Sequence, residues 1–491
     1  MVSCSLNLDF FSFCRLTMTD LIYSHILLSE TLCFAEDKAR SDNAHEKSKF
    51  LSSLALLLNG DAACTAVYVN QTEKTVLIAR NEPTSTQDHR YFNHFFALVR
   101  IYSNICFDKE KDASSKDAKN LLRSVVYKYN AKKIIKRFTN KKAAILDRLK
   151  QLVDPKTDQT PFIDELRSKS QVYRHKPAIT EKLHLISKNR NDEEYVQHLF
   201  QEVKRFLIAY DQLIKNQANP TDEQFNDAIC SAVELYQSRL FLFILKSIEQ
   251  RDGDGVYYFE KISAHMRSLN LILKCLLSRR SDLGEIYKNI TWKLIPAVQK
   301  EAILNVTPKK AFEILFENCA PKSFNTLENL TSEEFYDKHL KRMSSYDENR
   351  RISVHVHAEI LLVDYLLNNG INQTSGLNDV EIGISKMPCL LCCYYISELN
   401  KKCNRYFFPS QWSNGKIYSK WLLRDAEDSS IIESINEKLV EKLKRAIQKL
   451  CLDSNRSGPH KSGDSDVMFA SIEVDEYDQE FSQSRDEKFL W

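Results

Sequence analysis

The sequence predicts an α/β fold in which one domain is split by a large all-α insertion. Glycine and proline contribute only 10 and 11 of the 491 residues, and so low a content favours long helices over a loop-rich or all-β protein. Residues 64–70 and 75–80 are two β-rich runs on either side of a short turn, which predicts a hairpin. Further β-rich runs begin near residue 380. The long segment 90–345 between the two groups has an almost wholly helical pattern.

A helix is expected directly before the hairpin, over 46–59. Its apolar residues recur at helical spacing and are Phe50, Leu51, Leu54, Leu57 and Leu58. Asn59 and Gly60 follow as a C-cap, and Asn81-Glu82-Pro83 closes the hairpin. We therefore take 46–86 as one unit of helix plus hairpin.

The insertion is expected to form a helical bundle of its own. Its clearest helical patterns cover 191–217, 222–250, 257–280 and 308–319. Pro220 lies in a loop before the second of these patterns. No internal repeat of fixed period is present. With its connecting residues, this domain is assigned to 90–345.

The last part of the chain, 350–452, returns to an α/β pattern. The expected elements are a helix over 354–367, a strand over 380–384, a turn over 385–388, a helix over 389–400, a strand over 405–408 and an amphipathic helix over 431–452 that covers the sheet. From Asp453 onward the chain is rich in Ser, Asp, Glu and Gly and lacks apolar periodicity. Residues 453–491 are therefore expected to form a disordered acidic tail.

The residues that carry chemistry lie between His357 and Cys392. Zinc is bound by nitrogen and sulfur ligands, and a catalytic zinc site uses three protein ligands and leaves a fourth position to water. His357, Cys389 and Cys392 supply such a set. Glu359 suits proton transfer for the activated water better than ligation beside two thiolates. The alternative for the two cysteines is that they are small buried residues of an apolar helix.

These residues resemble the cytidine-deaminase-like superfamily, whose zinc enzymes carry H-x-E and P-C-x-x-C. Here the two motifs are His357-Ala358-Glu359 and Pro388-Cys389-Leu390-Leu391-Cys392. Within the superfamily, the run Ile382–Lys386 and the Gly-Lys-x-Tyr-x-x-Trp pattern of 415–421 resemble the deaminase-like family of fungi and intracellular bacteria. Many relatives have a histidine before that glycine, where this chain has Asn414.

The resemblance implies a three-layer domain, a mixed sheet with helices on its faces. It also implies that 46–86 and 350–452 build this domain together. In the superfamily an asparagine after the second strand contacts the nucleoside sugar, and Asn81 is the matching position. A strand-ending turn explains an asparagine there equally well.

One stretch of the insertion is strongly basic. Residues 116–150 hold 12 Lys or Arg against two Asp, with aromatic residues interleaved. A candidate nucleic-acid ridge consists of Lys132, Lys133, Lys136, Arg137, Lys141 and Lys142. Such ridges bind phosphate backbones by counterion release, and aromatic side chains can stack on bases. The alternative is a solvated helix face whose aromatic residues pack inward.

Residues 1–45 are expected to form an N-terminal helical extension. The apolar stretch 16–34 contains Asp20, His25 and Glu30, which argues against a membrane span. The first residues also lack the basic region of a secretory signal. Thirteen scattered cysteines, an odd number, suit a reducing compartment. A cytoplasmic or nuclear location is therefore expected, with no membrane partner.

The leading functional hypothesis is a zinc-dependent hydrolase of cyclic amidines. It would deaminate a nucleobase, cytosine or adenine, either free or within single-stranded RNA or DNA. The competing hypothesis is a catalytically inactive deaminase-like interaction or effector module with a structural zinc. A thiol redox protein that uses Cys389 and Cys392 is a third reading, but it leaves His357 and Glu359 unexplained.

Overall fold

The computed structural model describes a large part of the chain. The described residues are 18–31, 46–62, 64–107, 112–139, 143–154, 192–238, 241–242, 244–245, 254–277, 286–303, 306–307, 311, 351–371, 378–402, 405–409, 413, 415–418, 420–422 and 429–456.

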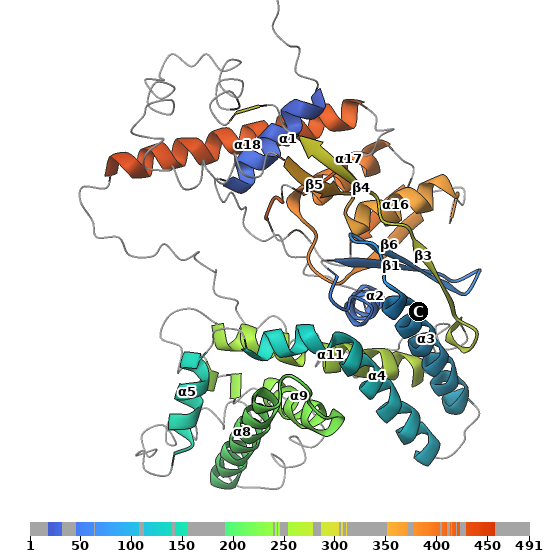
Figure 1. Cartoon of the computed structure of the whole chain (residues 1–491), viewed down its shortest axis with the longest axis vertical. Coiled ribbons are helices and arrows are strands. Elements are labelled where there is room, and N and C mark those ends of the chain that lie inside the picture. The colour runs from blue at the N-terminus through green and yellow to red at the C-terminus, as the bar shows by residue number, and fades with distance from the viewer. Residues whose placement is uncertain are drawn as a thin grey trace, which may run out of the picture.

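The protein is mixed α/β and is organised around a five-stranded sheet of order β3-β2-β1-β6-β7 (Figure 1). The strands are β1 (Thr65–Asn70), β2 (Thr75–Arg80), β3 (Thr291–Ile295), β6 (Asn378–Ile384) and β7 (Arg405–Pro409). β1 is antiparallel to both β2 and β6, whereas the β2–β3 and β6–β7 pairs are parallel. The hairpin and the cysteine-bearing part of the chain therefore share one sheet, as the predicted split fold requires.

Both faces of the sheet are covered, and alternate residues of the hairpin serve the two sides. Val67, Val69, Val76 and Ile78 pack into a core with α2 (Glu46–Leu57) and the helical insertion. Ala66, Tyr68, Leu77 and Ala79 pack into a second core with α16 (Ala358–Asn368) and α17 (Leu390–Lys402). This arrangement gives the three layers expected from the resemblance.

Helix α2 lies unusually close to β6 because of one glycine. A Cβ atom on Gly383 would stand 2.2 Å from the carbonyl carbon of Leu51. Backbone atoms cannot approach a side chain so closely, so only glycine allows this contact. The helix and the strand are more than 300 residues apart in sequence, and Gly383 lets them pack backbone against backbone.

The helical insertion lies on the α2 side of the sheet (Figure 1). Its described helices are α3 (Thr86–Phe107), α4 (Asp112–Thr139), α5 (Ala143–Leu152), α8 (Asp192–Lys215), α9 (Asp222–Tyr236) and α11 (Asp254–Leu277). The pattern predicted over 222–250 is interrupted, because α9 ends at a C-cap on Gln237. The helix predicted over 308–319 lies almost wholly outside the described residues.

The structure differs from the sequence prediction in two places. Residues 291–303, expected to be helical, form β3 and β4 (Gln299–Ile303), and β4 pairs with β5 (Arg351–His355). The helix expected from Val354 instead begins at Ala358, because 351–355 is strand. In both cases strand pairing outweighs a weak helical pattern.

The C-terminal helix α18 (Ser429–Arg456) covers α17 and the N-terminal helix α1 (Met18–Thr31). His25 Nδ1 of α1 hydrogen bonds to Asn436 Oδ1 of α18 at 2.9 Å. Glu398 of α17 pairs with Lys401 and with Lys438 of α18. Among the described residues, no helix has both the length and the apolarity needed to cross a membrane.

The insertion is joined to the C-terminal end of α2 by hydrogen bonds to carbonyl groups at and just beyond the end of this helix. Leu57 O accepts from Tyr91 Oη at 2.9 Å and from Asn130 Nδ2 at 3.2 Å. Gly60 O accepts from Lys133 Nζ at 2.7 Å. The last carbonyls of a helix lack partners within the helix, and positive charge there is favourable. The insertion thus supplies hydrogen-bond donors to the carbonyl groups at the end of α2.

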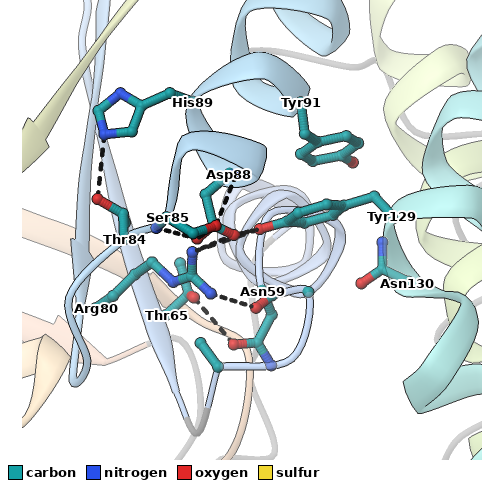
Figure 2. A network of polar contacts seen from close by, with 12 residues as sticks. Asn59, Thr65, Arg80, Thr84, Ser85, Asp88, His89, Tyr91, Tyr129 and Asn130 are labelled. Atoms are coloured by element: carbon teal, nitrogen blue, oxygen red, sulfur yellow. Dashed lines mark hydrogen bonds and ion pairs between the residues drawn. The ribbon is translucent and has the colours of Figure 1, made fainter.

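Arg80 is the centre of this junction and is itself buried (Figure 2). It donates to Asn59 O at 3.0 Å and pairs with Asp88 Oδ1 at 2.8 Å. Tyr129 Oη donates to the same carboxylate at 2.5 Å, and the Tyr129 ring stacks on Tyr91 with centroids 3.6 Å apart. Burial opposes the charge on Asp88, but the hydrogen bonds from Tyr129, Arg80 and Ser85 outweigh it and lower its pKa to about 2.

This depressed pKa predicts a stability change at acid pH. The Asp88 carboxylate stabilises the fold above its ordinary pKa of 3.8, and the contribution is lost as pH falls toward 2. We expect Asp88→Asn to lower the unfolding free energy near neutral pH by on the order of 2 kcal/mol and to flatten its fall between pH 4 and 2. Urea titrations at several pH values measure both effects. Asp211→Asn, which removes an exposed ion pair with Lys150, is the control and should cost less than about 1 kcal/mol.

Candidate metal centre and active site

Two helix N-termini meet at the candidate site. His357 is the N-cap residue of α16, in extended conformation (φ −67°, ψ 148°), and its side chain makes no capping hydrogen bond. Cys389 directly precedes α17, and its Sγ accepts the N–H of Cys392 at 3.4 Å. Sulfur therefore occupies the place where a capping oxygen normally lies. The positive ends of both helices favour thiolate over thiol at this point.

The three predicted metal ligands come together. His357 Nδ1 lies 3.5 Å from Cys389 Sγ and 3.3 Å from Cys392 Sγ, and the two sulfur atoms are 3.3 Å apart. Among the described residues, this is the one group of three or more His, Cys, Asp or Glu side chains whose ligand atoms lie close enough together to hold a metal ion. All three residues are buried. Tetrahedral zinc with ordinary bond lengths would separate such donors by about 3.5–3.8 Å, so both the donor set and its spacing fit zinc.

The pKa of each of the three side chains is changed by at least one of the other two. Burial opposes ionisation of Cys389, but hydrogen bonds from Cys392 and His357 and the charge on His357 hold the pKa of Cys389 well below its ordinary value. Burial and the Cys389 thiolate raise the pKa of Cys392. Burial lowers the pKa of His357, but the thiolate of Cys389 outweighs burial and gives a net rise. A buried thiolate beside an imidazolium is a preformed place for a cation that displaces the remaining protons.

Glu359 lies in the first turn of α16, with 2% of its surface exposed. Its Oε2 atom is buried and has no hydrogen-bond partner. Burial is the main cause that raises the pKa of this carboxyl. A buried carboxylate oxygen without a partner is costly unless it serves a function, and this one is next to the ligand cluster.

Asn81 lies at the site, although it comes from the other part of the chain. Its Oδ1 accepts the N–H of Ala358 at 2.7 Å, and its Nδ2 contacts His355 Nε2 at 3.2 Å. Because the His357 side chain faces the cysteines, Asn81 replaces it as the cap of α16. This geometry does not test the predicted contact of Asn81 with a nucleoside sugar. Both the oxygen and the nitrogen of its amide have hydrogen-bond partners within the protein.

His355 supports the ligand histidine. The two rings lie with centroids 5.4 Å apart and planes 29° apart. Burial, followed by the charges of His357 and Lys420, lowers the pKa of His355 to about 4. The ring is therefore neutral at physiological pH and can accept the Asn81 hydrogen bond. No pattern in the sequence indicates its link to Asn81.

The Gly-Lys-x-Tyr-x-x-Trp segment forms one wall of the site. Lys416 O accepts the N–H of Leu390, the first residue of α17, at 2.9 Å. Lys420 O accepts the N–H of His355 at 2.9 Å, and Trp421 is buried. The Tyr418 ring centroid lies 6.5 Å from that of His357. The segment is therefore hydrogen-bonded to the start of α17, next to Cys389, and to His355, two residues before His357.

Two further thiols lie beside the cluster. Burial, and then the charge on Glu359, raises the pKa of Cys64 to about 12. Burial and the Cys389 thiolate raise the pKa of Cys393 to about 12. Ser385 Oγ donates to Cys64 Sγ at 3.8 Å. Sequence reasoning did not identify Cys64, because it comes from the loop before β1 and has no spacing relation to the other cysteines.

The residues of the predicted basic ridge divide between two faces of α4. Lys132 and Lys136 are exposed, and Lys132 lies 3.6 Å from Asp61. Lys133 and Arg137 face the protein instead: Lys133 donates to Gly60 O and Ala62 O, and Arg137 donates to Lys261 O. Lys141 and Lys142 lie outside the described residues. Nucleic-acid contact by this ridge stays a prediction.

Residues 356–425 match the model of a protein family described as OTT_1508-like deaminases. The matched segment includes His357, Glu359, Cys389, Cys392 and the 415–421 wall. Neither the curated proteins nor the solved structures include a match to this chain. The chain therefore contains a deaminase-like domain with a candidate metal site, and the similarity covers only this part of it.

The geometry predicts which cysteines bind metal. Cys392→Ser should abolish or strongly weaken zinc binding, because it removes one of three buried ligands. Cys393→Ser should retain one zinc per chain, although it changes the adjacent residue of the same helix. Elemental analysis of the purified proteins measures this. Equal zinc content in both variants would contradict the assigned ligand set.

Proposed function

We propose that this protein is a zinc-dependent hydrolytic deaminase of a nucleobase. The observation that carries the proposal is the buried carboxylate of Glu359, which lies next to the His357, Cys389 and Cys392 cluster and has an oxygen without a partner. A metal cluster that only stabilises a fold does not need such a group. The similarity of 356–425 to a deaminase family supports the same reaction class.

In this proposal the three ligands hold zinc through one imidazole and two thiolates. When bound, zinc supplies a nucleophile at neutral pH by lowering the pKa of a water molecule. Glu359 would accept one proton of this water and deliver it to the ring nitrogen, and would carry the second proton of the water to the amino group, which leaves as ammonia. The base loses its amino group to water and becomes the corresponding carbonyl compound, so no redox partner is needed.

The chain's other residues prepare the site for this proton transfer. Asn81 fixes the start of α16 through the Ala358 N–H, and this fixes the direction of both His357 and Glu359. The two thiolates cancel the charge of the metal, so a neutral planar base meets no strong field. The aromatic ring of Tyr418, close to His357, offers a surface for such a base.

We propose cytosine or adenine as the base, because both carry an amino group on a ring carbon next to a ring nitrogen. A single-stranded RNA or DNA presents either base without the cost of extracting it from a duplex. The helical insertion, which a small free nucleoside does not require, favours a polymeric substrate.

An inactive interaction module with a structural zinc is the second candidate. One observation favours it: burial, and with it the charge of Cys389, raises the pKa of both Cys64 and Cys393, and either thiol, if it moved into the group of His357, Cys389 and Cys392, would close the site to water as a fourth ligand. A closed four-ligand site is the structural form of zinc. Glu359 would then have no role, which is why we place this candidate second.

Replacing the carboxylate separates the two candidates. Glu359→Gln should keep one zinc per chain and lose about 10²–10⁴-fold in deamination rate, because proton transfer is removed while the ligands remain. Ammonia release from cytidine, adenosine and single-stranded oligonucleotides provides the assay. Glu398→Gln alters another buried glutamate, which pairs with lysines on α17 and α18, and should keep the activity. A Glu359→Gln protein as fast as the wild type would refute the proton-transfer role.

A further inference from the structure

Both ends of the Asn81 side-chain amide are held by the protein itself. A backbone N–H can only donate, so the atom of Asn81 that lies 2.7 Å from the Ala358 nitrogen must be the amide oxygen. The atom that faces His355 Nε2 at 3.2 Å is therefore the amide NH₂ group, which also can only donate. His355 Nε2 is then the acceptor and carries no proton. One backbone N–H thus fixes both the orientation of the amide and the tautomer of the imidazole.

The backbone of His355 is held on both edges of its strand. On one edge β5 pairs with β4, where His355 lies opposite Gln299. On the other edge, the His355 N–H donates to Lys420 O at 2.9 Å, and the His355 carbonyl accepts the N–H of Leu422 at 3.0 Å. A strand that is paired on both edges cannot turn about its axis, so the side chain keeps its side of the strand. The imidazole is therefore held toward Asn81.

Little of Asn81 is left for a substrate. Only 5% of the residue is exposed, and its backbone N–H donates to Cys64 O at 3.3 Å. A sugar hydroxyl that took the place of His355 as the partner of the amide NH₂ group would leave a partly buried ring nitrogen without its hydrogen bond. That loss costs binding free energy. The contact between Asn81 and His355 thus competes directly with recognition of a sugar.

The same two residues reach the candidate metal ligand His357. Asn81 holds the N–H of Ala358, the residue directly after this histidine. The rings of His355 and His357 lie with centroids 5.4 Å apart and planes 29° apart. A fixed backbone on one side and a fixed ring on the other limit the directions that the ligand imidazole can take. Groups behind metal ligands usually contribute about 10–100-fold to metal affinity or activity.

We propose that His355 and Asn81 act as one positioning pair, in which His355 keeps the Asn81 amide on the start of α16. Asn81 then sets the direction of His357 and does not bind the sugar of the substrate. The protein selects its substrate by the base, and neither ribose nor deoxyribose is recognised through Asn81. His355 is a positioning residue, because it acts through Asn81 and His357. The inference rests on the proposed function only where it concerns the substrate.

The first test measures the metal site and needs no substrate. The full-length protein is loaded with cobalt(II), whose charge-transfer absorption reports the arrangement of thiolate and imidazole ligands. His355→Leu and Asn81→Ala should each shift these bands and weaken metal affinity by about 10–100-fold. His355→Gln supplies a side-chain oxygen that can accept from the Asn81 amide, so this variant should recover most of the affinity.

A double variant tests whether the two residues act together. Asn81→Ala combined with His355→Leu should lose clearly less metal affinity than the product of the two single losses, because both changes break the same contact. The control is Asn400→Ala, near the C-terminal end of α17. The Asn400 amide also has both ends engaged, with the N–H of Phe407 at 2.9 Å and its carbonyl at 3.1 Å. This control should keep the cobalt spectrum and the metal affinity of the parent.

The second test separates positioning from sugar binding. Ammonia release from cytidine, adenosine and single-stranded RNA and DNA oligonucleotides gives kcat and KM for each active substrate of the zinc-loaded protein. Asn81→Ala should lower kcat and leave KM within about twofold of the parent, because a positioning residue acts on the reacting groups and not on uniform binding. The effect should be the same for RNA and DNA, and His355→Leu should reproduce it.

Three results would overturn the positioning pair. One is a His355→Leu protein whose cobalt absorption and metal affinity match the parent. Another is a double variant whose loss equals the product of the single losses. The third is an Asn81→Ala protein with raised KM and unchanged kcat, which would reveal a direct sugar contact. Failure of the proposed function looks different: the parent would release no ammonia from any substrate, while the cobalt spectrum would still respond to His355→Leu.

Discussion

The structure depends on the meeting of two helix N-termini at one buried point. His357 and Cys389 each stand directly before a helix, and the partial positive charges of both helix ends point toward the sulfur atoms. Two thiolates in an apolar interior are otherwise very costly. The helix ends offset part of this cost, and a cation held by the three ligands would offset more of it. Glu359 is the second residue of α16 and follows the N-cap His357 by two positions. The same arrangement therefore places its carboxyl group in the buried interior, close to the ligands.

The long insertion does not disturb this arrangement because it is attached to elements that the sheet already fixes. Helix α2 packs backbone to backbone on β6 at Gly383, and the insertion satisfies the C-terminal carbonyls of α2 through Tyr91, Asn130 and Lys133. The residue after Arg80, which anchors this junction, is Asn81, which caps α16. The end of β2 and the residue after it thus connect the insertion, the sheet and the candidate metal ligands.

The sequence was sufficient to predict the split α/β fold, because strong patterns such as the hairpin and the cysteine helix are local. It was also sufficient to place His357, Cys389 and Cys392 together, because their residue types and their order indicate one site. It did not predict β3 and β4, whose short runs gain their conformation from partners distant in sequence. It did not reveal Cys64 or the Asn81–His355 contact, since neither has any spacing relation to the cysteines.

The measurement that tests the central claim most directly is X-ray absorption at the zinc edge of the purified full-length protein. An open catalytic site predicts two sulfur atoms at about 2.3 Å and two nitrogen or oxygen atoms at about 2.0–2.1 Å, one of the latter from His357 and the other from solvent. Three or four sulfur atoms would show that Cys64 or Cys393 closes the site. The buried carboxylate of Glu359 would then have no water to act on, and the hydrolytic account would be contradicted.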